Sequence, residues 1–429
     1  MRSIRIRVLV TGAAAITIGI CADTNVSEKY SSTHDPVSIA VDKGMKWLVS
    51  VQGKDGGWGQ DGGETSYVRK GERLESNGND VANTAVAAEA LLHAGNTPTR
   101  GAYHEALQRA VRFVLEHVER SAVDGLAVSD LNGTQIQRKL GPYIDTFMTS
   151  KLLADLDGNM GNAQENARVR QNLEKCVAKV EKSQLKDGSW NIAGGWAPIL
   201  GTSMASQSLF VASLKGVTVR AKAMSDVDSY TAKTFAAPLP GSGAGVAGGV
   251  IGGVGSGSGG GFAIGGLGGV AAGSDSMISG GAVSSAGRAM SAEVSAVSAG
   301  ISLYKRAQEL EQLSRTPEDR KKNGAQIKAI QAQLSDPRFV TGFGSIGGEE
   351  FFSYLNISDS LHRAGGPEWD RWNSEMKAKI LTMQNEDGTW AGHHCITGRV
   401  AVTSAAILML VADREKTFLT TSTRTEPKH

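Results

Sequence analysis

One short phrase occurs three times in this chain of 429 residues, and it constrains the fold more than any other feature. The copies are "QGKDGGW" at 52–58, "QLKDGSW" at 184–190 and "QNEDGTW" at 384–390. Asp-Gly is a turn dipeptide, because Asp bonds to nearby amides and Gly accepts a positive φ. A buried Trp needs an acceptor for its indole N–H. Each copy is therefore predicted to tie one helix pair to the next, through Gln52, Asp55, Trp58, Gln184, Asp187, Trp190, Gln384, Asp387 and Trp390.

Each copy follows an amphipathic stretch and precedes a more apolar one. We predict amphipathic helices at 36–52, 103–119, 163–184 and 368–384, and apolar partners at 79–95, 143–156, 201–216 and 398–413. A fifth apolar helix is expected at 349–365, with its partner within 300–335. A helix that is apolar nearly all round must be buried on most sides. The sequence therefore predicts an all-α fold in which amphipathic outer helices surround apolar inner ones.

Local signals divide the chain further. Thr316 before Pro317 and Glu318 is a helix start signal, and Asp336-Pro337 is a stop signal. Residues 241–300 hold 21 of the 54 glycines, and glycine costs a helix about 1 kcal/mol against alanine. We therefore assign residues 35–216 and 301–413 to the helical fold, 217–300 to a flexible, low-complexity Gly/Ala/Ser-rich insertion, and 414–429 to a disordered tail.

The N-terminus has the layout of a secretory signal peptide. Residues 1–22 combine three arginines with an apolar run that is too short for a comfortable membrane span. We expect cleavage after Ala22 and a periplasmic or extracellular location. Cys21 leaves a lipoprotein anchor open, although Ile20 stands where such signals have a small residue. Membrane association is expected only through these features.

Cysteine content and charge exclude some classes. Removal of 1–22 leaves Cys176 and Cys395, which cannot build a disulfide framework, and whether they pair stays open. The net charge is +2 and no basic stripe carries interleaved aromatics, so the sequence predicts no nucleic-acid partner. No cofactor or metal is expected. The partner stays open, with an apolar small molecule and another protein as the alternatives.

The three phrases resemble the QW repeats of the prenyltransferase and squalene oxidase repeat family, which includes squalene cyclases and protein prenyltransferase β subunits. The resemblance covers most of 36–216 and 348–413. It implies an α/α toroid, here an incomplete or five-to-six-pair barrel of inner and outer helices around a central cavity. It is the position of each copy between an amphipathic and an apolar helix that makes the resemblance specific.

The catalytic motifs of that family are missing. The cyclases use an Asp-x-Asp-Asp cluster, and the nearest string here, "SDVDSY", offers only Asp226 and Asp228. The prenyltransferases hold zinc with an Asp-x-Cys motif, which this chain lacks, although "HHC" at 393–395 has metal-ligand types. Cyclase cavities are lined with aromatics, whereas this chain is only 6% aromatic. No catalytic residue is therefore assigned.

Several polar residues are candidates for the cavity wall: Glu89, Tyr143, Asp145, His393 and His394. Glu89 lies within an apolar, Ala-rich helix, where a buried carboxylate needs a partner or acquires a raised pKa. Asp145 in the first turn of its helix suits the helix dipole as well as it suits a ligand.

Three hypotheses remain open. The first is an exported toroid that binds or scaffolds without family chemistry. The second is a cyclase- or prenyltransferase-like enzyme acting on an apolar isoprenoid. The third is a polysaccharide-acting toroid, because "DGGWGQDGG" at 55–63 resembles a phrase of toroidal pectate lyases, with Asp61, Glu64, Arg69 and Asp80 as acids and base of the right types.

Overall fold

The computed structural model describes residues 35–61, 78–192, 198–236, 301–334, 347–392 and 396–414. In these ranges the secondary structure is helical, and the β-bridges Trp58–Asp80 and Thr97–Arg100 are isolated. This agrees with the all-α prediction. The helices are α1 (Pro36–Ser50), α2 (Val81–His93), α3 (His104–Arg120), α4 (Gln135–Leu140), α5 (Ile144–Leu156), α6 (Ala163–Lys182), α7 (Pro198–Leu214), α8 (Ala221–Ala236), α10 (Ile301–Leu313), α11 (Pro317–Lys322), α12 (Gly324–Leu334), α14 (Gly348–Ala364), α15 (Pro367–Thr382) and α16 (Arg399–Leu410).

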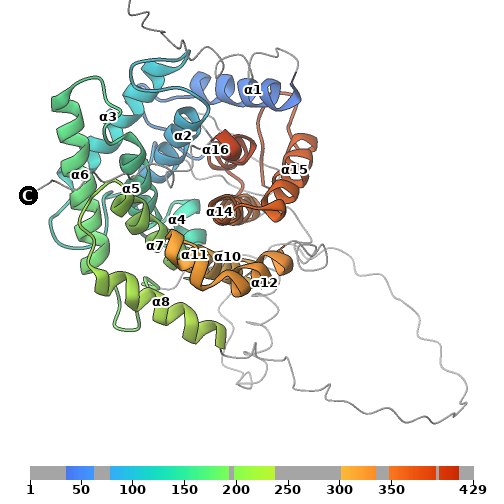
Figure 1. Ribbon diagram of the computed structural model, residues 1–429. Coiled ribbons are helices and arrows are strands. Elements are labelled where there is room, and N and C mark those ends of the chain that lie inside the picture. The colour runs from blue at the N-terminus through green and yellow to red at the C-terminus, as the bar shows by residue number, and fades with distance from the viewer. Residues whose placement is uncertain are drawn as a thin grey trace, which may run out of the picture.

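The inner helices contact one another in a closed order. Helix α2 packs against α5, α5 against α7, α7 against α10, α10 against α14, α14 against α16, and α16 against α2. In α2 and α16 nearly every residue is buried, as their apolar sequences require. Figure 1 shows α14 and α16 near the centre of the molecule.

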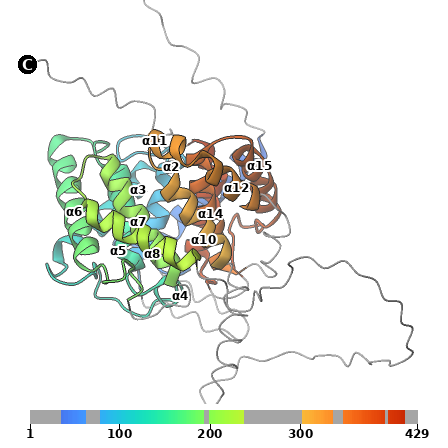
Figure 2. The same cartoon turned by 60° about the horizontal axis from the view of Figure 1, so that its bottom comes forward.

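The remaining long helices lie outside this cycle, as the two views agree (Figures 1 and 2). Helix α3 packs on α2, α6 on α5 and α7, and α8 on α7 and α10. Helix α12 packs on α10, α15 on α14 and α16, and α1 on α16 and α2. Helix α3 shows why: its buried side chains, from Ala106 to Val118, share one face, and the opposite face is polar.

The three copies of the repeated phrase have one geometry. In the first copy the Gln52 amide donates to the Gly56 carbonyl at 2.8 Å and to the Ala106 carbonyl of α3 at 2.9 Å. The buried Trp58 indole donates to Leu48 of α1 at 2.8 Å. The phrase thus joins the end of one outer helix to the beginning of the next.

The other copies repeat these bonds. Gln184 donates to Ala223 of α8, and Gln384 donates to Ala40 of α1, both at 2.8 Å. The indoles of Trp190 and Trp390 donate back to Val180 and Ile380, the residues ten positions earlier. The third copy therefore connects the last outer helix to the first.

A different device occupies the corresponding place after α3. The Lys175 ammonium of α6 donates to the carbonyls of Val118 and Ser121 at 2.7 and 2.8 Å. Lys179, one turn later, donates to the carbonyls of Gly125 and Ala127 at 3.0 and 3.1 Å. These bonds satisfy carbonyls that the end of α3 and the following turn leave free. Lys175 and Lys179 thus join α6 to the end of α3, as the Gln and Trp of the repeated phrase join other helices.

Two sequence-based assignments can be compared with the structure. Thr316 caps α11 through a reciprocal bond with Asp319, so the predicted helix start is correct. The boundary of the 217–300 insertion is wrong at its first part, because 221–236 form α8. Residues 217–236 contain no glycine, so nothing in their composition opposes a helix. The predicted signal peptide at 1–22, the glycine-rich residues 241–300 and residues 415–429 of the predicted 414–429 tail lie outside the described residues, whereas Arg414 ends a 3-10 helix, Ala412–Arg414.

Candidate functional site

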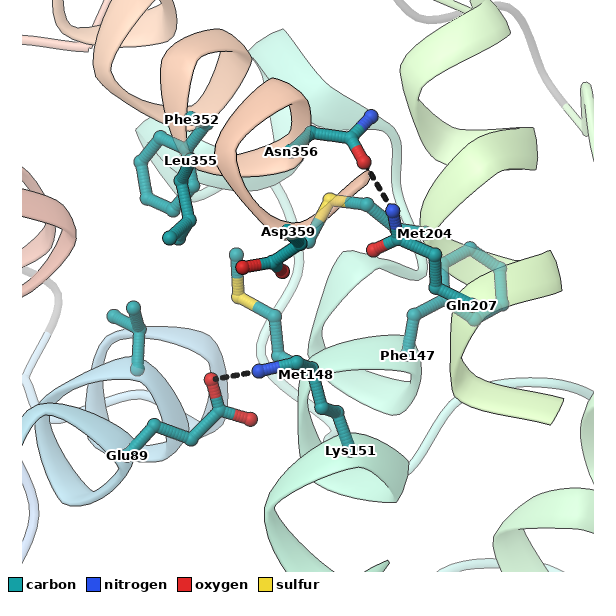
Figure 3. A pocket seen from close by; sticks show the side chains of 11 residues that line it. Glu89, Phe147, Met148, Lys151, Met204, Gln207, Phe352, Leu355, Asn356 and Asp359 are labelled. Carbon is teal, nitrogen blue, oxygen red and sulfur yellow. Dashed lines mark hydrogen bonds and ion pairs between the residues drawn. The ribbon is translucent and has the colours of Figure 1, made fainter. Parts of the chain in front are cut away.

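A cavity lies among the inner helices α2, α5, α7 and α14 (Figure 3). Its volume is about 40 Å³, enough for roughly three water molecules. Each helix contributes one face, and the lining comprises Val86, Glu89, Phe147, Met148, Lys151, Met204, Gln207, Phe352, Leu355, Asn356 and Asp359. Three of these side chains are ionisable: Glu89 on α2, Lys151 on α5 and Asp359 on α14.

Glu89 is the most buried of the three ionisable groups, with a side chain 5% exposed. Its Oε2 lies 3.4 Å from the Lys151 ammonium, whereas its Oε1 accepts no hydrogen bond within the described residues. Burial raises the pKa of Glu89 to about 7, although Lys151 opposes this and Asp155 adds to it. The carboxyl therefore changes charge near neutral pH, which an exposed glutamate does not do.

A second ion pair lies one turn further along the same two helices. His93 Nε2 of α2 is 3.1 Å from Asp155 Oδ2 of α5. Glu89 and His93 are four residues apart on α2, as Lys151 and Asp155 are on α5, so each pair shares a helix face. In the first pair the acid is on α2 and the base is on α5. In the second pair the histidine is on α2 and the acid is on α5. They connect α2 to α5 and place charge at the cavity from both helices.

Two uncharged amides, Gln207 and Asn356, also line the cavity. Gln207 of α7 donates to the side-chain oxygen of Asn356 on α14, and Asn356 donates to the Ser203 hydroxyl at 3.1 Å. Figure 3 shows Gln207 and Asn356 facing each other across the wall, and Asp359 directed toward the space between α14 and α5. The amides therefore fix α7 against α14, and the carboxylates face the cavity.

The residues predicted from the sequence to line the cavity lie in different places in the structure. Glu89 lines the cavity, whereas Tyr143 and Asp145 do not. Asp145 is buried at the start of α5, where burial, opposed by the Thr146 backbone amide and supported by the nearby Asp80 carboxyl, raises its pKa to about 7. Tyr143 is the half-buried residue before α5. His393 and His394 lie outside the described residues.

The other acids named from the sequence have structural partners. Asp228 pairs with Arg315 at 3.0 Å, and Asp226 pairs with Lys222 one turn away on exposed α8. Asp61 accepts from the Arg399 backbone amide at the start of α16, at 3.1 Å, and Asp80 caps α2. These four aspartates form neither an Asp-x-Asp-Asp-like site nor a lyase-like acid cluster. Glu64 and Arg69 fall outside the described ranges.

Cys176 is a packed core residue. It is buried on α6, and burial raises the pKa of its thiol to about 12. A thiol with so high a pKa is neither a metal ligand nor a nucleophile near neutral pH. Cys176 is a free thiol, and Cys395 lies outside the described residues.

Buried carboxyls give a measurable pH dependence of stability. Burial raises the pKa of Asp80 to about 6 and of Asp145, Glu89 and Glu350 to about 7. In the unfolded chain these groups ionise near pH 4, so between pH 5 and 7.5 the folded state holds more protons and stability falls as pH rises. Urea unfolding is expected to give a free energy of unfolding at least about 3 kcal/mol larger at pH 5 than at pH 7.5.

The control for this prediction is a variant in which two buried carboxyls no longer titrate. Glu89→Gln combined with Asp145→Asn is expected to flatten the dependence, because the amides keep the shape but bind no proton. A free energy of unfolding that rises from pH 5 to pH 7.5 in the native chain contradicts the prediction.

Sequence reasoning found Glu89 but missed Lys151, Asp359, His93 and Asp155. A signal for four of these five exists, since each pair of charged residues sits at i, i+4 within an apolar helix, where charge is costly unless it is paired. No local pattern indicates which helix faces Glu89, because its partner is 62 residues away in the chain.

Among the described residues, no group of three or more His, Cys, Asp and Glu side chains could hold a metal ion, and no helix is long and apolar enough to cross a membrane. Comparison with protein-family models gives no match. Comparison with curated proteins gives none either. Beyond the all-α class, an interpretation of this chain therefore depends on the repeated phrase and on the cavity.

Proposed function

We propose that this protein is an α/α toroid of the QW-repeat type that binds a small ligand and does not catalyse the reactions of the resembling family. The closed order of inner-helix contacts and the three equivalent Gln–Trp turns support the toroid. The observation that carries the binding role is the cavity at the centre of that arrangement. At about 40 Å³ it falls well below the roughly 300–1,000 Å³ of sites that enclose drug-sized molecules.

Export is part of the proposal. The three arginines and apolar run of 1–22 support delivery across a membrane. The cyclase and prenyltransferase motifs are absent from the sequence. Asp226 forms an ion pair with Lys222, and Asp228 forms one with Arg315. Both observations support binding over catalysis. A fold by itself does not determine a reaction.

One observation favours a second candidate, an acid-catalysed conversion of an apolar isoprenoid. Glu89 is a buried carboxyl with a pKa of about 7, so a large fraction of it carries a proton at neutral pH. A protonated interior carboxyl is the group that alkene protonation requires. Against this candidate stand the small cavity and the ammonium of Lys151 at 3.4 Å, which favours the ionised form.

The two candidates are separated by a product assay. The full chain is incubated with squalene and with farnesyl diphosphate at pH 6.5, and the extracts are analysed by gas chromatography and mass spectrometry. We expect both substrates to be recovered unchanged. A cyclised or transferred product that disappears in Glu89→Gln contradicts the binding proposal and establishes the second candidate.

A further inference from the structure

We propose that the central cavity binds the ammonium head group of a small alkylammonium ion, held by Glu89 and Asp359. This inference rests on the proposed binding function and names its ligand class. Of the three ionisable side chains that line the cavity, two are acids and one is a base. The neighbouring pair of His93 and Asp155 adds an acid and a histidine. Acids therefore outnumber lysines at and beside the cavity, which favours a cationic ligand over an anionic one.

The second step is an unsatisfied acceptor. Of the two Glu89 carboxyl oxygens, Oε2 accepts from Lys151, and Oε1 is buried with no hydrogen-bond donor within the described residues. A buried carboxylate oxygen without a donor is destabilised, because it has given up its hydration. A ligand N–H directed at Oε1 would restore that bond. An anion or an ether oxygen would not.

Much of the remaining lining is apolar. Phe147 and Phe352 line the cavity together with the thioethers of Met148 and Met204. Aromatic faces and polarisable sulfur accommodate a cation with an attached alkyl chain, and the chain gains from the apolar contact. Acidic groups lining the same cavity as aromatic, aliphatic and thioether groups complement an alkylammonium ion.

The last step is access and size. Lys151, Met204, Leu355 and Asp359 are part-exposed, whereas Glu89 is buried, so the cavity has an accessible side and a closed end. A volume of about 40 Å³ admits a head group and the first carbons of a chain, with the rest along Met204 and Leu355. The ligand is thus expected to enter chain-last, ammonium toward Glu89.

The test is isothermal titration calorimetry of the full chain at pH 8 with three probes of matched size: n-butylammonium, 1-butanol and butyrate. We expect butylammonium to bind at least about tenfold more tightly than 1-butanol, and butyrate to give no heat of binding. Glu89→Gln is expected to abolish the preference for the cation. Asp370→Asn, which removes one exposed acid outside the cavity, is expected to bind as the native chain does.

Two further measurements make the outcomes distinct. Lowering the pH from 8 to 6 is expected to weaken butylammonium binding, since Glu89, facing Lys151, His93, Asp155 and Asp359, then gains a proton. Circular dichroism melting checks that Glu89→Gln is folded. Equal binding of butylammonium and 1-butanol overturns the cation inference and leaves the proposed binding function standing. Binding of none of the probes overturns the cation inference, whereas conversion of squalene overturns the proposed function.

Discussion

Replacing Trp390 by alanine is expected to lower the free energy of unfolding by about 3–5 kcal/mol, the loss typical of large aromatic side chains deleted from a core. The side chain is fully buried, and its indole N–H donates to Ile380 at 2.8 Å. Its backbone amide donates to the Thr403 hydroxyl of α16 at 3.0 Å. The deletion leaves a cavity between α15 and α16 and removes one of the hydrogen bonds to the Ile380 carbonyl, which together explain the size of the effect.

The control for this prediction is another tryptophan with less burial. Trp47 of α1 is half-buried beneath the Arg399 guanidinium, whose carbon lies 5.0 Å from the ring centroid. Trp47→Ala is expected to cost less than half as much as Trp390→Ala in urea unfolding. Equal losses for the two variants contradict the idea that the repeated phrase is a principal tie between the helix pairs.

Gly188→Ala is expected to destabilise the protein by at least about 3 kcal/mol, through steric clash and backbone strain together. Gly188 has a φ of +93°, and a Cβ there would lie 2.2 Å from the Asp226 carbonyl oxygen of α8. The turn and the next outer helix are too close for any side chain. Either the turn or α8 has to move, and the bond from Gln184 to Ala223 would be lost with it.

Gly216→Ala is the matched control. Gly216 also has a positive φ, +74°, but a Cβ there meets nothing within 4 Å. Its substitution is expected to cost only about 1 kcal/mol, from backbone conformation alone. The difference between the variants, measured by urea unfolding, isolates the contact between turn and helix. A difference of zero contradicts the close approach.

The helices themselves were predictable where local chemistry specifies them. Asp80 caps α2 through the Asn83 amide, and Thr316 caps α11, as the sequence signals indicate. Helix α4 and helix α8 were missed: the first is one and a half turns long, and the second adjoins a glycine-rich stretch whose composition dominates the pattern. Propensity is a weak guide where tertiary contacts decide the outcome.

The site was predictable only in part, because its contacts are long-range. The single unusual residue, Glu89 in an alanine-rich helix, carried the signal. Lys151 faces Glu89, and Asp359 of α14 lines the same cavity. Both contacts follow from how α2, α5 and α14 are placed around one centre. The hydrogen bonds from the lysines of α6 to the end of α3 were missed for the same reason. The sequence indicates that Lys179 is an ordinary exposed residue of an amphipathic helix, yet it is buried.

The bond from Gln384 to Ala40 spans 344 residues and has a consequence for the order of folding. During synthesis α1 emerges first, but α15 and α16, on which it packs, emerge last. Contacts of such separation raise the contact order and slow folding. The first helix must therefore wait for nearly the whole chain, while the pairs from α2 to α7 can pack as they emerge. A chain that ends before residue 384 lacks α16 and is therefore expected to leave much of the apolar face of α1 uncovered.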